Sequence, residues 1–145
     1  MKQREVALSI LIPTRNRAFY AMSAVRSMLA WSSKDFELVV QDNSDGDRME
    51  SDIEPFRDDP RLRYAHCRQR LDMTANFEVA AELATGRYLA FLGDDDGVNR
   101  EAVDAAMWAG EEGLDALVPL ARARYYWPDH RFRYYGGVSA GSLEL

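Results

Sequence analysis

Three consecutive carboxylates, Asp94, Asp95 and Asp96, stand between two glycines at the end of a short apolar run. Neighbouring carboxylates repel one another, so such a run is tolerated when solvated and becomes useful when a divalent cation lies among the oxygens. Gly93 and Gly97 allow the backbone to turn sharply and a ligand to approach closely. The run therefore predicts a metal site. The alternative is an acidic turn that caps the next helix.

Two further polar groups follow predicted strands nearer the start of the chain. The first group is Thr14, Arg15, Asn16 and Arg17. Its hydroxyl and amide groups suit a nucleobase, and its arginine forks suit phosphates. The second group begins with Asp42, which can accept hydrogen bonds from a base or a ribose. Both groups have structural alternatives, because Thr14 or Asn16 can cap a helix and Asp42 can bond its own backbone in a turn.

The elements that must position these residues alternate along the chain. Short apolar runs predict strands, and apolar residues at helical spacing predict helices. The predicted strands are 6–12, 36–40, 62–66, 88–92 and 114–120. The predicted helices are 17–31, a short one within 47–59, 72–84 and 101–112. We therefore expect an α/β fold, with a mostly parallel sheet flanked by helices on both faces.

Proline, glycine and asparagine mark the expected ends of these elements. Pro13 is expected to end the first strand. Gly86 and Gly113 stand where glycine usually stops a helix, and Asn99 is expected to be the N-cap of the last predicted helix.

The length of 145 residues fits a single domain, which we expect over 1–145 with its core in 6–120. The aromatic and basic tail, 121–145, predicts a hairpin around residues 127–130 and then a loop. We expect this tail to lead to an acceptor-binding part outside the chain, which would make the fold incomplete.

Composition narrows the classes of function. The net charge of -6 argues against a nucleic-acid binder that works by neutralising phosphates. The single cysteine, Cys67, excludes an intrachain disulfide, and the apolar run 6–12 is too short to span a bilayer. These features predict a cytoplasmic protein. His66 and His130 lack metal-ligand spacing with a cysteine or a second histidine, and are predicted to be surface or hairpin residues.

Together, the three polar groups and the strands before them resemble the inverting glycosyltransferases of family 2. That family has the GT-A fold, a Rossmann-like fold shared by nucleotide-diphospho-sugar transferases. The resemblance is carried by LSILIPTRNR at 8–17, by FELVVQDNSD at 36–45 and most strongly by residues 76–96, which end in ATGRYLAFLGDDD. It covers about residues 6–118. Three motifs in the right order are more specific than any one of them.

The resemblance implies roles for the matching positions. Thr14 would lie against the nucleobase, Asp42 would bind the base or ribose, and Asp94 would face the ribose or diphosphate. Asp95 matches the metal-binding aspartate, with Asp96 beside it, and the implied cofactor is Mg²⁺ or Mn²⁺. The other nucleotide-binding positions implied are Arg15, Asn16, Arg17 and Asn76.

The resemblance also implies a mechanism, a single in-line displacement at the anomeric carbon of a nucleotide-diphosphate sugar. The metal neutralises the departing diphosphate, and a carboxylate base deprotonates an acceptor that is a glycan, a lipid or a protein. In the family that base lies beyond the fifth strand. After Leu120 the only carboxylates are Asp129 and Glu144, and neither matches the motif. Gly93 stands where many members carry the first aspartate of Asp-x-Asp-Asp.

Other classes fit parts of this pattern. A sugar-nucleotidyltransferase needs a glycine-rich loop after the first strand, and residues 13–17 contain no glycine. A signalling receiver domain needs a lysine after the fifth strand, and no lysine follows Lys34. A non-catalytic nucleotide-binding module stays open because no base is identified. A truncated sheet would expose an edge, which predicts self-association into a homo-oligomer.

Overall fold

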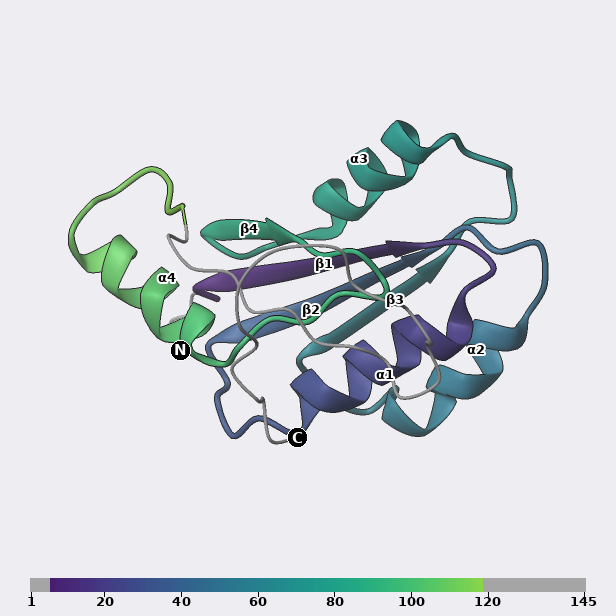
Figure 1. Cartoon of the computed structure of the whole chain (residues 1–145), viewed down its shortest axis with the longest axis horizontal. Helices are drawn as coiled ribbons and strands as arrows, with labels where there is room; N and C mark the ends of the chain where they lie inside the picture. The colour runs from purple at the N-terminus through teal and green to yellow at the C-terminus, as the bar shows by residue number, and fades with distance from the viewer. Residues whose placement is uncertain (1–5, 119–145) are drawn as a thin grey trace, which may run out of the picture.

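The computed structural model describes residues 6–118 (Figure 1). The strands are β1 (Leu8–Thr14), β2 (Phe36–Asp42), β3 (Leu62–His66) and β4 (Tyr88–Phe91). The helices are α1 (Ala18–Leu29), α2 (Arg48–Ile53), α3 (Met73–Leu83) and α4 (Glu101–Glu111), with a 3-10 turn, η1 (Glu54–Phe56), after α2. The sheet is parallel throughout, in the order β3-β2-β1-β4, which confirms the α/β class.

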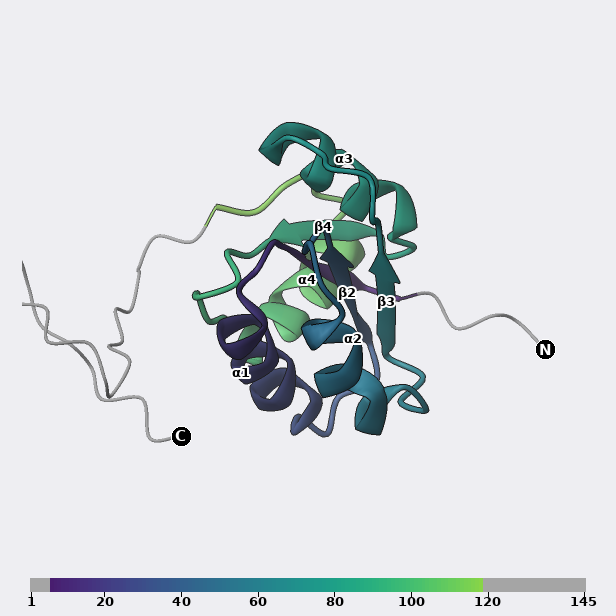
Figure 2. The same cartoon turned by 90° about the vertical axis from the view of Figure 1, so that its right-hand side faces the viewer.

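Helices cover both faces of the central strands, and all seven residues of β1 and of β2 are buried. Burial on both faces explains why these strands are apolar without alternation. Leu8, Ile10 and Ile12 face the larger core, which α1, α2 and α4 complete. Leu11 faces the smaller core and packs with Ala80 of α3. Figure 2 shows α3 on one side of the sheet and α1 with α2 on the other.

The prediction that Pro13 ends the first strand is wrong. β1 continues through Thr14, because its pairing with β2 extends to Pro13↔Gln41 and Thr14↔Asp42. On the other side, pairing with β4 stops at Leu11↔Phe91. Proline has no N–H to donate, so it can end the ladder with one neighbour while the ladder with the other continues. As a result, Thr14 is held at the edge of the sheet.

The expected helix ends are partly confirmed. Gly113 has φ 69°, the left-handed conformation expected of a glycine after a helix. Gly86 does not end α3. It allows close packing on β1, because a Cβ at this position would lie 2.6 Å from the backbone N and from Oγ of Ser9. Asn99 is not the N-cap of α4, since Arg100 occupies that position and makes no side-chain cap bond.

The predicted fifth strand is wrong over the residues that the structure describes. Residues 114–118 form no strand. The N–H of Leu114 bonds to Ala109 O at 2.9 Å, and its carbonyl accepts from the hydroxyl of Tyr88, so this segment folds back on the end of α4. The tail predicted over 121–145 lies outside the described residues. Across 6–118, no helix is both long and apolar enough to cross a membrane.

Candidate functional site

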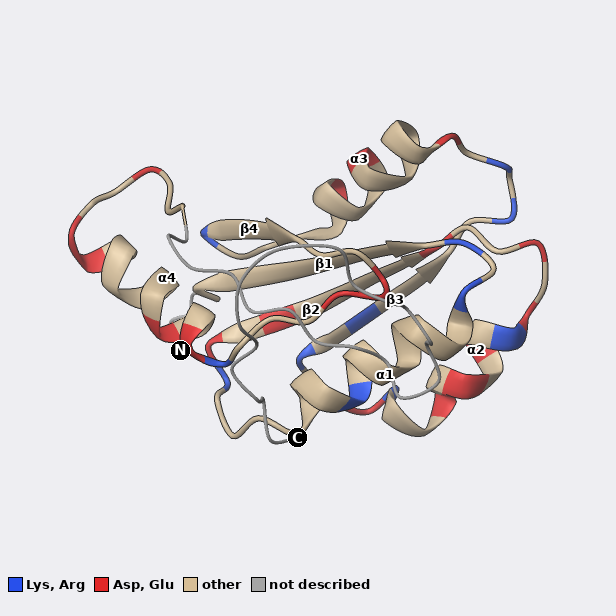
Figure 3. Cartoon of the chain, viewed as in Figure 1, with Lys and Arg blue, Asp and Glu red and all other residues tan. Residues whose placement is uncertain are grey.

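The loops that follow β1, β2 and β4 lie at one edge of the sheet, because parallel strands end on the same side (Figure 1). Figure 3 shows basic and acidic stretches on these loops. Ligands of open parallel sheets bind in the crevice outside this edge. The three polar groups of the sequence are therefore brought into one region.

Thr14, the last residue of β1, meets the acidic run directly. Its hydroxyl donates to Asp94 Oδ2 at 2.8 Å, although 80 residues separate the two. Arg17 then bridges two carboxylates, with Nη1 3.3 Å from Asp94 Oδ1 and Nη2 2.6 Å from Asp95 Oδ2. The structure thus joins Thr14, Arg17, Asp94 and Asp95 in one hydrogen-bonded group.

Burial dominates the electrostatics of Asp94 and raises the pKa of its carboxyl above the ordinary value. Asp95 and Asp96 act in the same direction, whereas the Thr14 hydroxyl and the Arg17 guanidinium oppose it. The hydrogen bond to Asp95 is the main cause that raises the pKa of Arg17. A further positive charge placed here would favour the ionised carboxylates, so this group is suited to a cation.

The acidic run becomes more exposed along its length. Asp94 is buried, the side chain of Asp95 is 45% exposed and Asp96 is exposed. A Cβ at Gly93 would lie 2.6 Å from Asp96 Oδ2 and 3.4 Å from Asp95 Oδ1. The two outer carboxylates therefore gather over this glycine. Among the described residues, the three aspartates of the run do not form a compact three-ligand group.

Arg15 and Asn16 connect the loop after β1 to the loop after β2. Arg15 donates to Asn43 O at 2.9 Å and to Asp45 Oδ1 at 2.5 Å. Asn16 donates through Nδ2 to Asp45 Oδ2 at 2.8 Å, and through its backbone N–H to Ser44 Oγ at 2.8 Å. Asn16 has φ 56°, a conformation that asparagine tolerates better than most residues. Both side chains bind the neighbouring loop here, and their contact with a nucleotide stays a prediction.

Asp42 is fully buried, and both of its oxygens accept hydrogen bonds from the chain. Oδ1 accepts from the N–H of Ser44 at 2.8 Å, and Oδ2 accepts from the hydroxyl of Tyr64 at 2.9 Å. Burial, together with the hydrogen bond to Asp42, raises the pKa of Tyr64, so the phenol keeps its proton. The bond to Ser44 is the turn contact expected from the structural alternative. The nucleotide role of Asp42 stays a prediction.

Two buried amides lie beside the end of β1 with unmet hydrogen-bonding atoms. Asn76 of α3 donates through Nδ2 to Thr14 O at 3.3 Å, but its Oδ1 has no partner within residues 6–118. Gln41 is fully buried, and neither atom of its amide has a partner in the same part of the chain. Sequence reasoning missed Gln41. The available signal is a polar residue directly after the apolar run 38–40.

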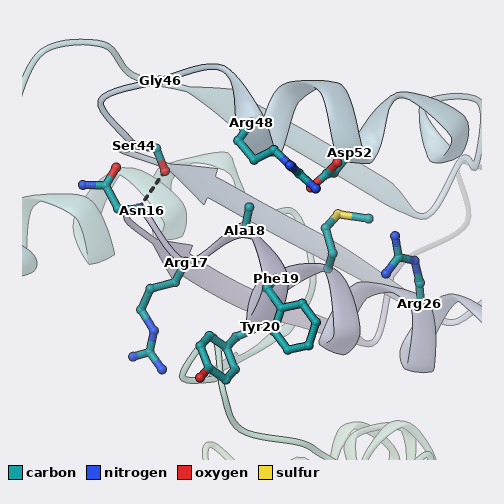
Figure 4. Close-up of a pocket in the computed structure, with 11 residues that line it drawn as sticks. Asn16, Arg17, Ala18, Phe19, Tyr20, Arg26, Ser44, Gly46, Arg48 and Asp52 are labelled. Atoms are coloured by element: carbon teal, nitrogen blue, oxygen red, sulfur yellow. Dashed lines mark hydrogen bonds and ion pairs between the residues drawn. The ribbon is translucent and has the colours of Figure 1, made fainter. Parts of the chain in front are cut away.

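A groove of about 620 Å³ lies between the start of α1 and the loop that leads into α2, and Arg17 joins it to the acidic run (Figure 4). Its lining includes Asn16, Arg17, Phe19, Ser44 and Arg48. Phe19 is 65% exposed. The sequence analysis did not select Phe19, although an aromatic side chain so close to Arg17 was the available signal. The groove offers polar, cationic and aromatic surface beside the acidic run.

His66 corrects another prediction from the sequence. It was predicted to be a surface or hairpin residue, but it ends β3, a parallel strand, and its side chain is only 7% exposed. Its Nε2 lies 3.1 Å from the carbonyl oxygen of Ser44. His130 lies outside the described residues.

Known glycosyltransferases are similar to this chain in sequence. The family model described as Glycosyl transferase family 2 matches residues 9–137. A GalNAc(5)-diNAcBac-PP-undecaprenol beta-1,3-glucosyltransferase of Campylobacter jejuni is 29% identical over 108 residues, which are 73% of this chain and 35% of that protein. An uncharacterized glycosyltransferase of Rickettsia conorii is 27% identical over 137 residues, which are 94% of this chain and 22% of that protein. The chain thus spans about a third or less of these relatives.

Solved structures extend the similarity to the fold. Residues 1–349 of TarS from S. aureus match with a TM-score of 0.62 and 25% identity, over 73% of this chain and 33% of that one. The same part of TarS in complex with UDP matches with a TM-score of 0.59 and 25% identity, over 73% of this chain and 32% of that one. The family model covers most of the chain, and the fold is similar to that of TarS over 73% of the chain. The chain belongs to glycosyl transferase family 2.

Proposed function

We propose that this chain is the donor-binding part of a glycosyltransferase that transfers a sugar, with inversion, from a nucleotide-diphosphate sugar. The observation that carries the proposal is the contact of Thr14, Arg17, Asp94 and Asp95 at the carboxyl edge of the sheet. The similarity to a glycosyltransferase solved with UDP supports a uridine nucleotide as the first donor to test.

The residues present fit a Mg²⁺ or Mn²⁺ ion. Asp95 and Asp96 offer carboxylate oxygens over Gly93, and Asp96 Oδ2 lies close to where a side chain at that position would begin. Asp96 therefore stands in for the aspartate that this chain lacks at Gly93. Hard cations that bind nucleotides use one or two carboxylates and complete their shell with phosphate and water, so a three-ligand cluster is not required. The ion would neutralise charge on the leaving diphosphate.

The Arg17 guanidinium can pair either with the carboxylates of Asp94 and Asp95 or with a diphosphate. It now neutralises Asp94 and Asp95, and its side chain is 44% exposed. If Asp95 and Asp96 held a metal ion, the ion would replace Arg17 as the partner of Asp95, and the guanidinium would become available to a diphosphate, whose geometry it matches. Thr14 and Asn76 then hold the base side of the site, where Asn76 Oδ1 and the Gln41 amide present unmet polar atoms. Asp42 supports this side by fixing the loop after β2.

Transfer also needs an acceptor site and a general base. The described residues supply the donor side, and the chain spans about a third or less of its relatives. We propose that the base and the acceptor site belong to sequence beyond residue 118. Donor binding and transfer are then separable properties, and donor binding is the one to test on this chain.

The test is titration of UDP into the chain with Mn²⁺ and with EDTA. We expect binding with Mn²⁺, loss of binding with EDTA, and at least roughly tenfold weaker binding by Asp95→Asn, since one ligand contact is about 1.4 kcal/mol or more. Asp104→Asn, an exposed change on α4, is the matched control. Equal UDP binding with Mn²⁺ and EDTA, or full binding by Asp95→Asn, would contradict the metal role.

A further inference from the structure

A second group of metal-binding residue types lies apart from the acidic run. It consists of Asp47, Glu50 and His66, each of which places one ligand atom within 4.8 Å of the others. Asp47 precedes α2, Glu50 lies in the first turn of α2, and His66 ends β3. Acidic groups on a surface are common without any ligand, so the argument depends on the histidine.

The hydrogen bonds of His66 determine which ring nitrogen carries the proton. Its Nε2 lies 3.1 Å from the carbonyl oxygen of Ser44, which can only accept, so Nε2 must be the donor. In the neutral ring, Nδ1 is then a bare lone pair. That atom is buried and has no hydrogen-bond partner among residues 6–118, and Glu50 Oε2 lies 3.6 Å from it. A lone pair that faces a carboxylate is unfavourable unless a positive charge lies between them, and either a proton on Nδ1 or a metal ion supplies it.

We propose that Asp47, Glu50 and His66 bind a divalent metal ion of the first transition row, and Zn²⁺ is the ion to test. One imidazole nitrogen and two carboxylates suit Zn²⁺ or Mn²⁺, whereas Mg²⁺ prefers oxygen alone. Two ligand atoms that share a tetrahedral ion at about 2.1 Å are about 3.4 Å apart. The separation of 3.6 Å between Nδ1 and Glu50 Oε2 is close to that value. The bond from Nε2–H to a backbone carbonyl is the usual support for a metal-binding histidine.

Arg68 and Arg57 compete for the same carboxylates. Arg68 lies 2.8 Å from Asp47 Oδ1 and 3.7 Å from Glu50 Oε2, and Arg57 lies 3.8 Å from Glu50 Oε1. The side chain of Arg68 is 67% exposed, so its ion pairs are weak and it can move into solvent at little cost. Neither arginine can satisfy the Nδ1 lone pair together with both carboxylates as an ion would. Removal of Arg68 should therefore strengthen metal binding.

The site would brace the loop beside the proposed donor pocket. His66 holds the carbonyl of Ser44, and the hydroxyl of Ser44 accepts from the backbone N–H of Asn16. A bound ion would thus fasten α2 to the end of β3 and steady the loop after β2. This role is structural and does not depend on donor binding at the acidic run.

The experiment is calorimetric titration of Zn²⁺ at pH 7.5 into the wild-type chain and into Asp95→Asn, which removes the main donor-edge carboxylate. We expect binding at Asp47, Glu50 and His66 in both proteins. Binding should weaken at least tenfold in Glu50→Gln and in His66→Gln, tighten several-fold in Arg68→Ala, and persist in Cys67→Ser, which removes the neighbouring thiol. In ¹⁵N-resolved NMR spectra, the His66 Nδ1 resonance should shift when Zn²⁺ is added.

Three results would overturn the proposal. They are absence of Zn²⁺ binding in both wild type and Arg68→Ala, unchanged binding in Glu50→Gln, and a Nδ1 resonance that Zn²⁺ does not move. Glu50 is 42% exposed, so its glutamine variant should stay folded. UDP binding with Mn²⁺ by Glu50→Gln separates this proposal from the donor-site proposal, because the change should leave UDP binding within about twofold.

Discussion

Two carboxylates paired with arginines lie at opposite ends of the sheet and have opposite surroundings. Glu37, at the amino end of β2, is 4% exposed. It accepts from Ser9 Oγ at 2.6 Å, from the Thr85 N–H at 2.5 Å and from Arg63 Nε at 2.8 Å. Asp95, beyond the carboxyl end of β4, pairs with Arg17 at 2.6 Å, and its side chain is 45% exposed.

The difference separates a structural carboxylate from one suited to a ligand. Glu37 fastens the start of β4 to β2, and donors of the chain surround its oxygens. Asp95 pairs with an arginine that is itself 44% exposed, so solvent, a metal or a phosphate can reach the pair. The same chemical pair therefore stabilises the fold at one end of the sheet and remains exchangeable at the other, where ligands of parallel sheets bind.

The largest expected effect is a loss of stability when Glu37, at the amino end of β2, is replaced. Glu37→Ala should lower the free energy of unfolding by about 3 kcal/mol, because it leaves the buried Ser9 hydroxyl and the Thr85 N–H without an acceptor. Urea denaturation measures this. Glu111→Ala, an exposed change on α4, should stay within about 0.5 kcal/mol. Equal losses of unfolding free energy in the two variants would contradict the structural role of Glu37.

The next effect compares the two arginines. Arg17→Gln should weaken UDP binding in Mn²⁺ roughly tenfold, because it removes the guanidinium proposed to contact the diphosphate. Arg63→Gln, the matched change at the amino end, should leave UDP binding unaltered and lower only the stability. Calorimetric titration of both variants measures this. Similar losses of UDP binding in the two would show that Arg17 has no special access to the nucleotide.

A smaller effect is expected at Gln41, near the carboxyl end of β2. Gln41→Met should raise the free energy of unfolding without ligand by about 1 kcal/mol, because it removes two buried polar atoms that have no partner among the described residues. Thermal unfolding measures this. A loss of stability would instead show that ordered water or another group meets this amide. Weaker UDP binding by the variant would assign the amide to the donor site.

The smallest effect is a pH dependence at Glu37. Burial alone would raise the pKa of this carboxyl, but hydrogen bonds from Ser9, Thr85 and Arg63 outweigh burial and lower it. A carboxyl whose pKa is lower in the folded chain adds stability above its unfolded value of about 4.3, and that stability is lost as the pH falls through the folded pKa. The stability advantage over Glu37→Gln should be full at pH 7 and shrink below about pH 4. A constant difference in urea denaturation would contradict this.

Most strands and helices could be predicted from the sequence because the patterns that indicate them are local. Apolar runs placed β2 and β3, and helical spacing placed α1, α3 and α4 to within about two residues. Pro13 misled because a proline interrupts the bonds to one neighbouring strand only, and sequence does not show which neighbour continues. The apolar run from residue 114 misled because hydrophobicity alone does not provide a strand with a partner.

For the site, too, the sequence predicted one part and only the tertiary structure showed the other. The sequence by itself determined that Thr14, Asp42 and the acidic run stand at or just after the carboxyl ends of strands, and parallel strands bring such residues to one edge. Only the tertiary structure decided which of them remain accessible, because accessibility depends on contacts between distant segments. Asp42 is buried beneath Tyr64, Asp95 stays open beside Arg17, and His66 is turned by the Ser44 carbonyl toward Glu50. The sequence specifies the residue types, but burial and hydrogen-bond partners are established only when the chain folds.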